Sequence, residues 1–535
     1  MSEGHFTIPV SVQRLIKDYN KQRRARAELE HVPKFKVSEA IGRMAFFYEK
    51  LRNALEYREE NLLVKSATVR ILKRRFVPGM DPASIAKPLI TELIHAGYIR
   101  NNTLPETALD EVAKVLIKYA RLLGKAIPSI EQQDQRDDIF QWVVTMAACE
   151  IEEIVTPAWE KRAVIEFIYV TLLERVDILS KKITEDERKV QIYIAVLRGH
   201  ARYDHDLTSY HLLNFFYPDW KEHKEDTINR VARNIINVKA TLAKQIQHSL
   251  QDRLLRQVKK INALFVILAN VFNQTEDPII LLQNPAALEE AIEEETRKEY
   301  KKVKSKLRRT SLRSIIYLFV TKMLVAFILE VPYDFIFLGH LNYIPLLINV
   351  SFHPMLLFFI ALMIHIPAKE NTRKIIEGIK NLVYNYDGKE VVYKIRPKTA
   401  RGAVVNFFFR IFYFLAFVFT FGVLIGLLIF LNFNWMSGVI FVMFLTLVSF
   451  FGLRVRQIAK DLVVLDHKDN LLSATIDLFS IPIVRAGRWL SVNFAKYNFI
   501  VFFLDVIIEA PFKLILDIFE DWLGYIREKR EEIYD

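Results

Sequence analysis

Apolar residues follow two different patterns on either side of about residue 310. Before that point they recur at three- and four-residue spacing among charged residues, as in "EAIGRMAFFYEKLRNALEYREENLL" after Ser38. From 314 to 453 they form long, nearly continuous runs. The first pattern is typical of amphipathic helices and the second of membrane spans. The sequence therefore predicts a mainly α, polytopic membrane protein with a large all-α cytosolic domain.

Four runs approach or exceed the roughly 20 apolar residues that a membrane-spanning helix needs. They lie at 314–331, 344–367, 403–433 and 435–453, which together define a four-span membrane region, 314–453. The third run is too long and too apolar for an ordinary soluble core helix. It contains Gly422 and Gly426 in a G-x-x-x-G pattern, which favours close helix packing, here within one chain because the third and fourth spans form a tight hairpin.

Lysine and arginine are distributed unevenly among the segments that join the spans. A dense basic run, "KKVKSKLRRTSLR", precedes the first span, and nine Lys or Arg residues separate the second from the third. The segment between the first two spans has none. The positive-inside rule then places both termini in the cytosol. Because no apolar core follows a basic start at the N-terminus, no secretory signal is indicated, and we expect a multi-pass protein of the cell's inner membrane.

Two ionisable residues interrupt the first span. Lys322 lies near its middle, where insertion costs about 2.5–3.5 kcal/mol. Glu330 follows roughly 12 Å further along the helix axis, which makes it a poor direct partner. We expect Lys322 either to line a polar pathway or bind an anion, or to hydrogen-bond hydroxyls and carbonyls inside the bundle or snorkel toward the surface.

The remaining chain divides by charge and by helix breaks. We predict a basic N-terminal segment 1–36, a cytosolic helical domain 37–226, a long, coiled-coil-like antiparallel hairpin 227–313, and C-terminal cytosolic or interfacial amphipathic helices 454–535. The first hairpin arm, 227–272, has no Pro or Gly and reads as one helix. The second arm turns basic toward the membrane, which predicts contact with anionic lipid headgroups. For 498–523, interfacial and embedded placements both stay open.

A short β element is expected between the second and third spans. "NLVYNYDGKEVVYKI" places Asp387-Gly388 between arms rich in Val and Tyr, a strong signal for a β-hairpin. We predict a cytosolic hairpin within the loop 368–402 and no other sheet.

Motifs for known chemistry are scarce. The chain lacks the phosphate-loop, dinucleotide, nucleophile-elbow and H-E-x-x-H patterns, and its single cysteine, Cys149, excludes thiolate zinc clusters. One dense group supplies candidate metal ligands: His200, Asp204, His205, Asp206 and His211. Adjacent His205-Asp206 resembles the metal dyad of HD-type phosphohydrolases, but the additional histidine and aspartate of that family have no counterpart. We predict no cofactor and leave open both a metal and enzymatic activity.

Three functions follow from these observations. The favoured one is an integral membrane protein that anchors a cytosolic scaffold or interaction domain, bound to a protein partner, at the inner face of the bilayer. Nucleic acid is a poorer partner because aromatic residues do not interleave with the basic N-terminal ones. The alternatives are a channel or transporter that uses Lys322, and a membrane-bound metal-dependent hydrolase that uses the histidine group.

Overall fold

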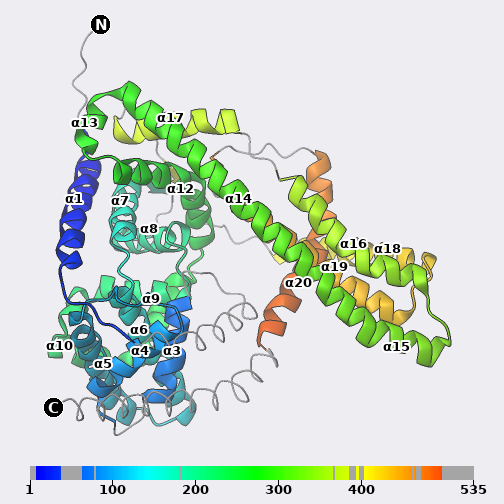
Figure 1. The fold of residues 1–535 in the computed structure, drawn as a ribbon, viewed down its shortest axis with the longest axis horizontal. Helices are drawn as coiled ribbons and strands as arrows, with labels where there is room; N and C mark the ends of the chain where they lie inside the picture. The colour runs from blue at the N-terminus through cyan, green and yellow to red at the C-terminus, as the bar shows by residue number, and fades with distance from the viewer. Residues whose placement is uncertain are drawn as a thin grey trace, which may run out of the picture. The chain divides into compact units, whose positions relative to one another are not determined.

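The computed structural model describes residues 8–37, 63–76, 80–179, 183–364, 368–384, 393–396, 403–460, 463–464 and 471–496. The chain is mainly helical (Figure 1). Four helices are long and apolar enough to cross a membrane, which confirms the prediction of a mainly helical chain with four candidate spans: Pro285–Leu338, Tyr343–Leu362, Val404–Phe430 and Trp435–Leu453.

The chain forms two compact units. The helical unit contains Val10–Val258 and Val391–Pro397, and the span unit contains most of the described chain from Lys259 onward. The first lies largely before the predicted spans, and the second holds all four of them.

The helical unit is built around α5 (Thr107–Ala126) and α6 (Gln133–Val155). Their buried residues, such as Leu116 and Val143, recur at helical spacing and belong to one large hydrophobic core. The surrounding elements are α1 (Val10–Glu30), α3 (Leu63–Arg75), η2 (Pro82–Ile85), α4 (Ala86–His95), η3 (Ile127–Ser129), α7 (Trp159–Arg175), α8 (Glu185–Gly199), α9 (His205–Phe216), η4 (Pro218–Glu222), α10 (Glu225–Arg233) and α11 (Ile235–Ile246).

The first arm of the predicted helical hairpin is not one helix. The structure divides it into α10, α11 and α12 (Gln251–Gln274), with breaks at Asn234 and after Ile246. Asparagine competes for local backbone hydrogen bonds and so favours helix ends. Ile228, Val231 and Leu242 are buried in the core of the helical unit. Tertiary packing therefore overrides the continuous helix that the absence of Pro and Gly suggests.

The described β structure is one two-stranded parallel sheet. It pairs β1 (Val176–Ile178) with β2 (Tyr393–Ile395) in the register Val176 to Tyr393. The predicted turn Asp387-Gly388 lies outside the described residues. Within them, the start of its first arm is helical, because α17 (Ala368–Val383) extends through it. The second arm is a strand as predicted, but its partner comes from a distant part of the chain.

The first span continues a long helix, α14 (Pro285–Val325). Asn284 caps its start by accepting from the amides of Ala286 and Ala287, and Pro285 occupies the first turn. After Val325 the chain passes through π turn η5 (Ala326–Glu330), α15 (Val331–Tyr333) and π turn η6 (Asp334–Leu338). The other elements of the unit are α13 (Pro278–Gln283), α16 (Tyr343–Leu362), α18 (Ala403–Phe430), α19 (Trp435–Lys460) and α20 (Leu471–Lys496).

Helix α14 contacts different neighbours along its length. Its N-terminal part lies beside α17, and its C-terminal part lies beside α16 and α19 (Figure 1). Large apolar side chains point outward from the span helices, among them Phe327, Leu347 and Phe419. Such an outward apolar surface suits contact with lipid rather than with water.

Helix α20 packs closely against two of the candidate spans. The hydroxyl of Thr420, in α18, donates to the carbonyl of Phe479 at 3.4 Å. A Cβ added at Gly487 would lie 1.9 Å from the carbonyl oxygen of Thr446, in α19. By contrast, a Cβ added at Gly422 or Gly426 would meet no atom within 4 Å. Among the glycines that the structure describes in this unit, Gly487 is the one at which the neighbouring backbone comes closest.

Gly487→Ala should destabilise the span unit, because the new methyl group meets backbone that cannot rotate away. Overpacking of this kind typically costs about 1–3 kcal/mol. Gly422→Ala is the matched control and should be neutral or slightly stabilising, since alanine favours helix by about 1 kcal/mol. Unfolding of the full chain in mixed micelles measures both variants. Equal effects would show that α19 and α20 do not approach as described.

Candidate functional site

A buried polar cluster lies between the first, second and fourth candidate spans. The Lys322 ammonium donates to Asn349 Oδ1 at 2.6 Å and lies 4.3 Å from the centre of the Phe444 ring. The Asn349 amide donates to Glu330 Oε1 and, at 3.1 Å, to the Ser437 carbonyl. Lys322 and Glu330 are each 1% exposed, and Asn349 is fully buried. Asn349 thus bridges two opposite charges that do not touch directly.

The π turns explain why Glu330 shares a face with Lys322. In a regular α-helix, two side chains that are eight residues apart, as Lys322 and Glu330 are, do not point to the same face. A π turn has more residues per turn, so positions along η5, which ends at Glu330, are rotated less than the same positions of an α-helix. Glu330 therefore points inward with Lys322, and π turns occur frequently at functional sites.

The cluster extends toward the end of the first span through Asp334, which is 2% exposed. One carboxylate oxygen accepts from the Asn342 amide at 3.1 Å, and the other accepts from the Asn434 side chain at 2.7 Å. Asn434 in turn accepts from the Ser437 amide at 2.8 Å, at the start of α19. These bonds fix the loop between the third and fourth spans to the first.

His353 completes the cluster from α16 and is fully buried. Its Nδ1 faces the Asn349 carbonyl at 3.2 Å, and its Nε2 faces the Phe441 carbonyl at 3.0 Å. Both ring nitrogens therefore lie against hydrogen-bond acceptors.

A second cluster surrounds α6 in the helical unit. The Lys118 ammonium lies 2.5 Å from Glu150 Oε1, and the Tyr119 hydroxyl donates to Glu150 Oε2 at 2.9 Å. Lys118 also donates to the Trp220 carbonyl at 3.2 Å, and the Trp220 indole donates to Tyr119. Burial lowers the pKa of Lys118 despite the attraction of Glu150. Two charges are thus held in the core with paired hydrogen bonds.

One turn further along α6, Glu153 collects cationic partners. Lys221 and Arg162 lie near its Oε2, and the Tyr210 hydroxyl donates to it at 3.2 Å. His211 Nε2 lies 3.6 Å from the other oxygen. Burial alone would raise the pKa of Glu153, but His211, Lys221 and Arg162 hold it below its usual value. Burial lowers the pKa of His211 to about 4, and the facing Glu153 carboxylate opposes this shift.

Both glutamates line a cavity of about 1070 Å³. Its walls come from α1, α5, α6 and α7 and combine apolar residues such as Trp159 with charged ones such as Lys114. A pocket of this size with a few convergent polar groups is the usual form of a binding site.

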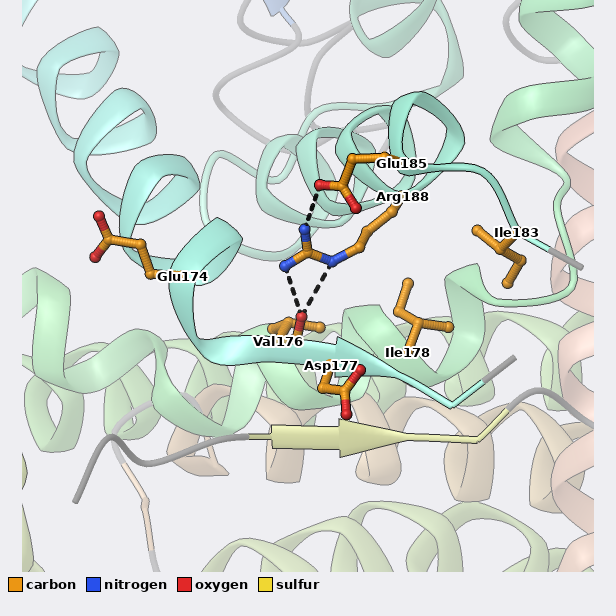
Figure 2. A pocket seen from close by; sticks show the side chains of 7 residues that line it. All are labelled: Glu174, Val176, Asp177, Ile178, Ile183, Glu185 and Arg188. Atoms are coloured by element: carbon orange, nitrogen blue, oxygen red, sulfur yellow. Dashed lines mark hydrogen bonds and ion pairs between the residues drawn. The ribbon is translucent and has the colours of Figure 1, made fainter. Parts of the chain in front are cut away.

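A smaller cavity of about 310 Å³ lies between β1 and α8 (Figure 2). Arg188 reaches across it and donates to the Val176 carbonyl at 2.8 and 3.2 Å, and its Nη1 pairs with Glu185 at 2.6 Å. Its Nη2 also donates to the Leu173 carbonyl. Because the guanidinium is occupied by these partners, it fixes α8 to β1 rather than presenting a free charge.

The predicted metal-ligand group does not converge on one point. Asp204 caps α9 by accepting from the Leu207 amide and pairs with Lys65, whose ammonium also lies 2.9 Å from Asp206. His205 Nδ1 lies 3.5 Å from the Ser209 hydroxyl. The other two histidines lie elsewhere: His200 ends α8, and His211 stacks on Tyr203 and faces Glu153. No group of three or more potential ligands gathers among the described residues.

Glu152 gives a testable pH dependence. Burial raises its pKa from 4.5 to about 7, with Lys65 opposing the shift only in part. Between pH 4.5 and about pH 7 the folded chain keeps a proton on Glu152 that the unfolded chain releases. The contribution of Glu152 to the free energy of unfolding therefore falls as pH rises through this range and is constant above it. Glu152→Gln should therefore gain stability relative to the native chain between about pH 5 and about pH 8.

Denaturant unfolding of the full chain at both pH values measures this gain, and hydrogen exchange of α6 peptides localises it. If the free energies of unfolding of the native chain and of Glu152→Gln changed equally with pH, a raised pKa at Glu152 would be contradicted.

Comparisons with known proteins found no match: no protein-family model, curated protein or solved structure is similar to this chain. The two clusters must therefore be interpreted from their own chemistry.

Proposed function

We propose that the four apolar helices anchor the helical unit at the inner face of a membrane, where its cavity binds a protein partner. The observation that carries this proposal is the cavity of about 1070 Å³, whose walls combine apolar and charged side chains. Mixed linings of this kind suit a polypeptide segment, because apolar contacts supply affinity and a few charges fix its position.

The span unit supports an anchoring role. Lys322 and Glu330 are bridged within the bundle by Asn349, which offsets part of the cost of placing them in lipid. The exposed basic residues of α14 before the first span, including Lys301, Lys304 and Arg308, suit anionic headgroups at about 1 kcal/mol each. The distribution of Lys and Arg favours this end of α14 on the cytosolic side.

Site-specific photo-crosslinking in cells tests the partner. A photoreactive residue at Trp159, on the cavity wall, should yield a discrete crosslinked species. The same residue at Val10, which is 71% exposed on α1 and does not line the cavity, is the control. A discrete product at Trp159 that is absent at Val10 supports the proposal. The same products at both positions, or none at Trp159, would count against it.

Ion flux through proteoliposomes tests the anchoring role against transport. We expect a bilayer that stays tight to inorganic ions with the native chain and with Lys322→Met, because the lysine is enclosed by Asn349 and Phe444. Flux that the substitution alters would instead make Lys322 part of a pathway.

A further inference from the structure

Four ionisable side chains are buried together in the candidate spans. They are Lys322 on α14, Glu330 in η5, Asp334 in η6 and His353 on α16. Helix α19 also packs against this cluster, and its contacts there come from Ser437, Phe441 and Phe444, none of which is charged. Among the described residues, the balance of charge in the cluster is therefore decided by these four.

The surroundings of Asp334 and Lys322 favour the charged form of each side chain. Both oxygens of Asp334 accept hydrogen bonds from amide groups, which favours the carboxylate. Lys322 donates to a carboxamide oxygen and faces an aromatic ring, which favours the ammonium. These two charges cancel, and Glu330 and His353 remain.

Electroneutrality then requires one proton on the remaining pair. A net charge in hydrocarbon is expensive, so an ionised Glu330 needs a protonated His353, and a neutral His353 needs a protonated Glu330. The geometry at His353 favours the first arrangement. Its ring nitrogens both face carbonyl oxygens, and only the imidazolium has two N–H donors to satisfy them.

Glu330 offers the second position for the proton. Its Oε1 accepts from Asn349, whereas Oε2 is buried without a hydrogen-bond partner among the described residues. Asn349 contacts both ends of the pair, through its backbone carbonyl at His353 and its side chain at Glu330. Moving the proton breaks one N–H bond and forms one O–H bond, which leaves a neutral imidazole and a carboxylic acid and conserves the net charge.

We propose that this cluster is an intramembrane proton-binding site that holds one exchangeable proton, at rest on His353 and transferable to Oε2 of Glu330. This function goes beyond anchoring, because a chain that serves only as an anchor needs no ionisable group at this depth. It gives the membrane region a ligand of its own, the proton, held by side chains of α16 and η5.

Infrared spectroscopy of the full chain in lipid nanodiscs tests the site. At neutral pH the native chain should show no carboxylic-acid band that Glu330→Gln removes, whereas Glu152, whose pKa burial raises to about 7, contributes equally to every variant. His353→Gln removes the resting position, so a carboxylic-acid band should appear and should disappear again in His353→Gln/Glu330→Gln. Ser351→Ala, on the exposed face of α16 beside the cluster, is the control and should show no band. Absence of the band in His353→Gln would overturn the proposal.

Nitrogen NMR of the native chain supplies a test that does not depend on altering the cluster. The His353 ring should give an imidazolium signal at neutral pH, assigned by its loss in His353→Gln and its retention in His340→Gln, whose histidine is exposed. A neutral ring at His353 in the native chain would overturn the resting position of the proton, and with it the proposal.

Discussion

Lys322→Met is expected to destabilise the span unit by about 3–5 kcal/mol, the range typical of removing one partner from a buried ion pair. The substitution retains the aliphatic volume but leaves Glu330, 1% exposed, bonded only to the Asn349 carboxamide. Unfolding of the full chain in mixed micelles measures the change, and hydrogen exchange of α14 and α16 peptides localises it.

A double-mutant cycle shows that the loss comes from the unpaired charge. Glu330→Gln added to Lys322→Met should recover much of the lost stability, because a neutral carboxamide then replaces the carboxylate that had lost the bridged ammonium of Lys322. Ser351→Ala is the control, since its hydroxyl bonds the Leu347 carbonyl of its own helix on an exposed face. If the two cluster substitutions act additively, Lys322 and Glu330 are not coupled through Asn349.

The second large effect is expected in the helical unit. Lys118→Met should cost about 3–5 kcal/mol, because Glu150, 5% exposed, would keep only the Tyr119 hydroxyl as its hydrogen-bond partner in the cluster. Local opening should appear as faster hydrogen exchange in α5 and α6 peptides of the full chain, together with an earlier unfolding transition.

Lys125→Met on the same helix is the matched control. Lys125 pairs with Glu225, but both side chains are substantially exposed, and such pairs contribute about 0–1 kcal/mol. Burial rather than charge alone should therefore separate the two variants. Similar losses from both would show that the Lys118 pair is not buried as described.

Periodicity predicts the parts of this fold that depend on local sequence. The four apolar runs became four candidate spans because a helix in lipid satisfies its own backbone. Predictions failed where distant packing decides the structure. Val231 and Leu242 are buried in the core of the helical unit, and the single helix expected over 227–272 is divided there into shorter helices. Strand β2 pairs with β1, more than 200 positions earlier in the chain, and hairpin signals carry no information about such a pairing.

The span cluster was only half visible in the sequence. Lys322 and Glu330 stand out as charges in an apolar run, but their spacing along a regular helix argues against an interaction. The π turns and Asn349 supply the connection. Asn349 carries a usable signal, because it is the one carboxamide within the run 344–367. The core pair Lys118–Glu150 left no such trace, since both residues lie in helices rich in charge.

Helix α14 connects two distant parts of the span unit without a break. It runs from Pro285 to Val325 with no glycine and no later proline, and the part from Glu289 to Lys322 is roughly 50 Å long. At one end it is bound to α17, where Lys380 pairs with Glu289 and the Asn371 amide donates to the Tyr300 hydroxyl. At its other end α14 carries Lys322. Because α14 has no hinge between these ends, a movement of α17 would be transmitted along the continuous helix to Lys322 and its buried partners.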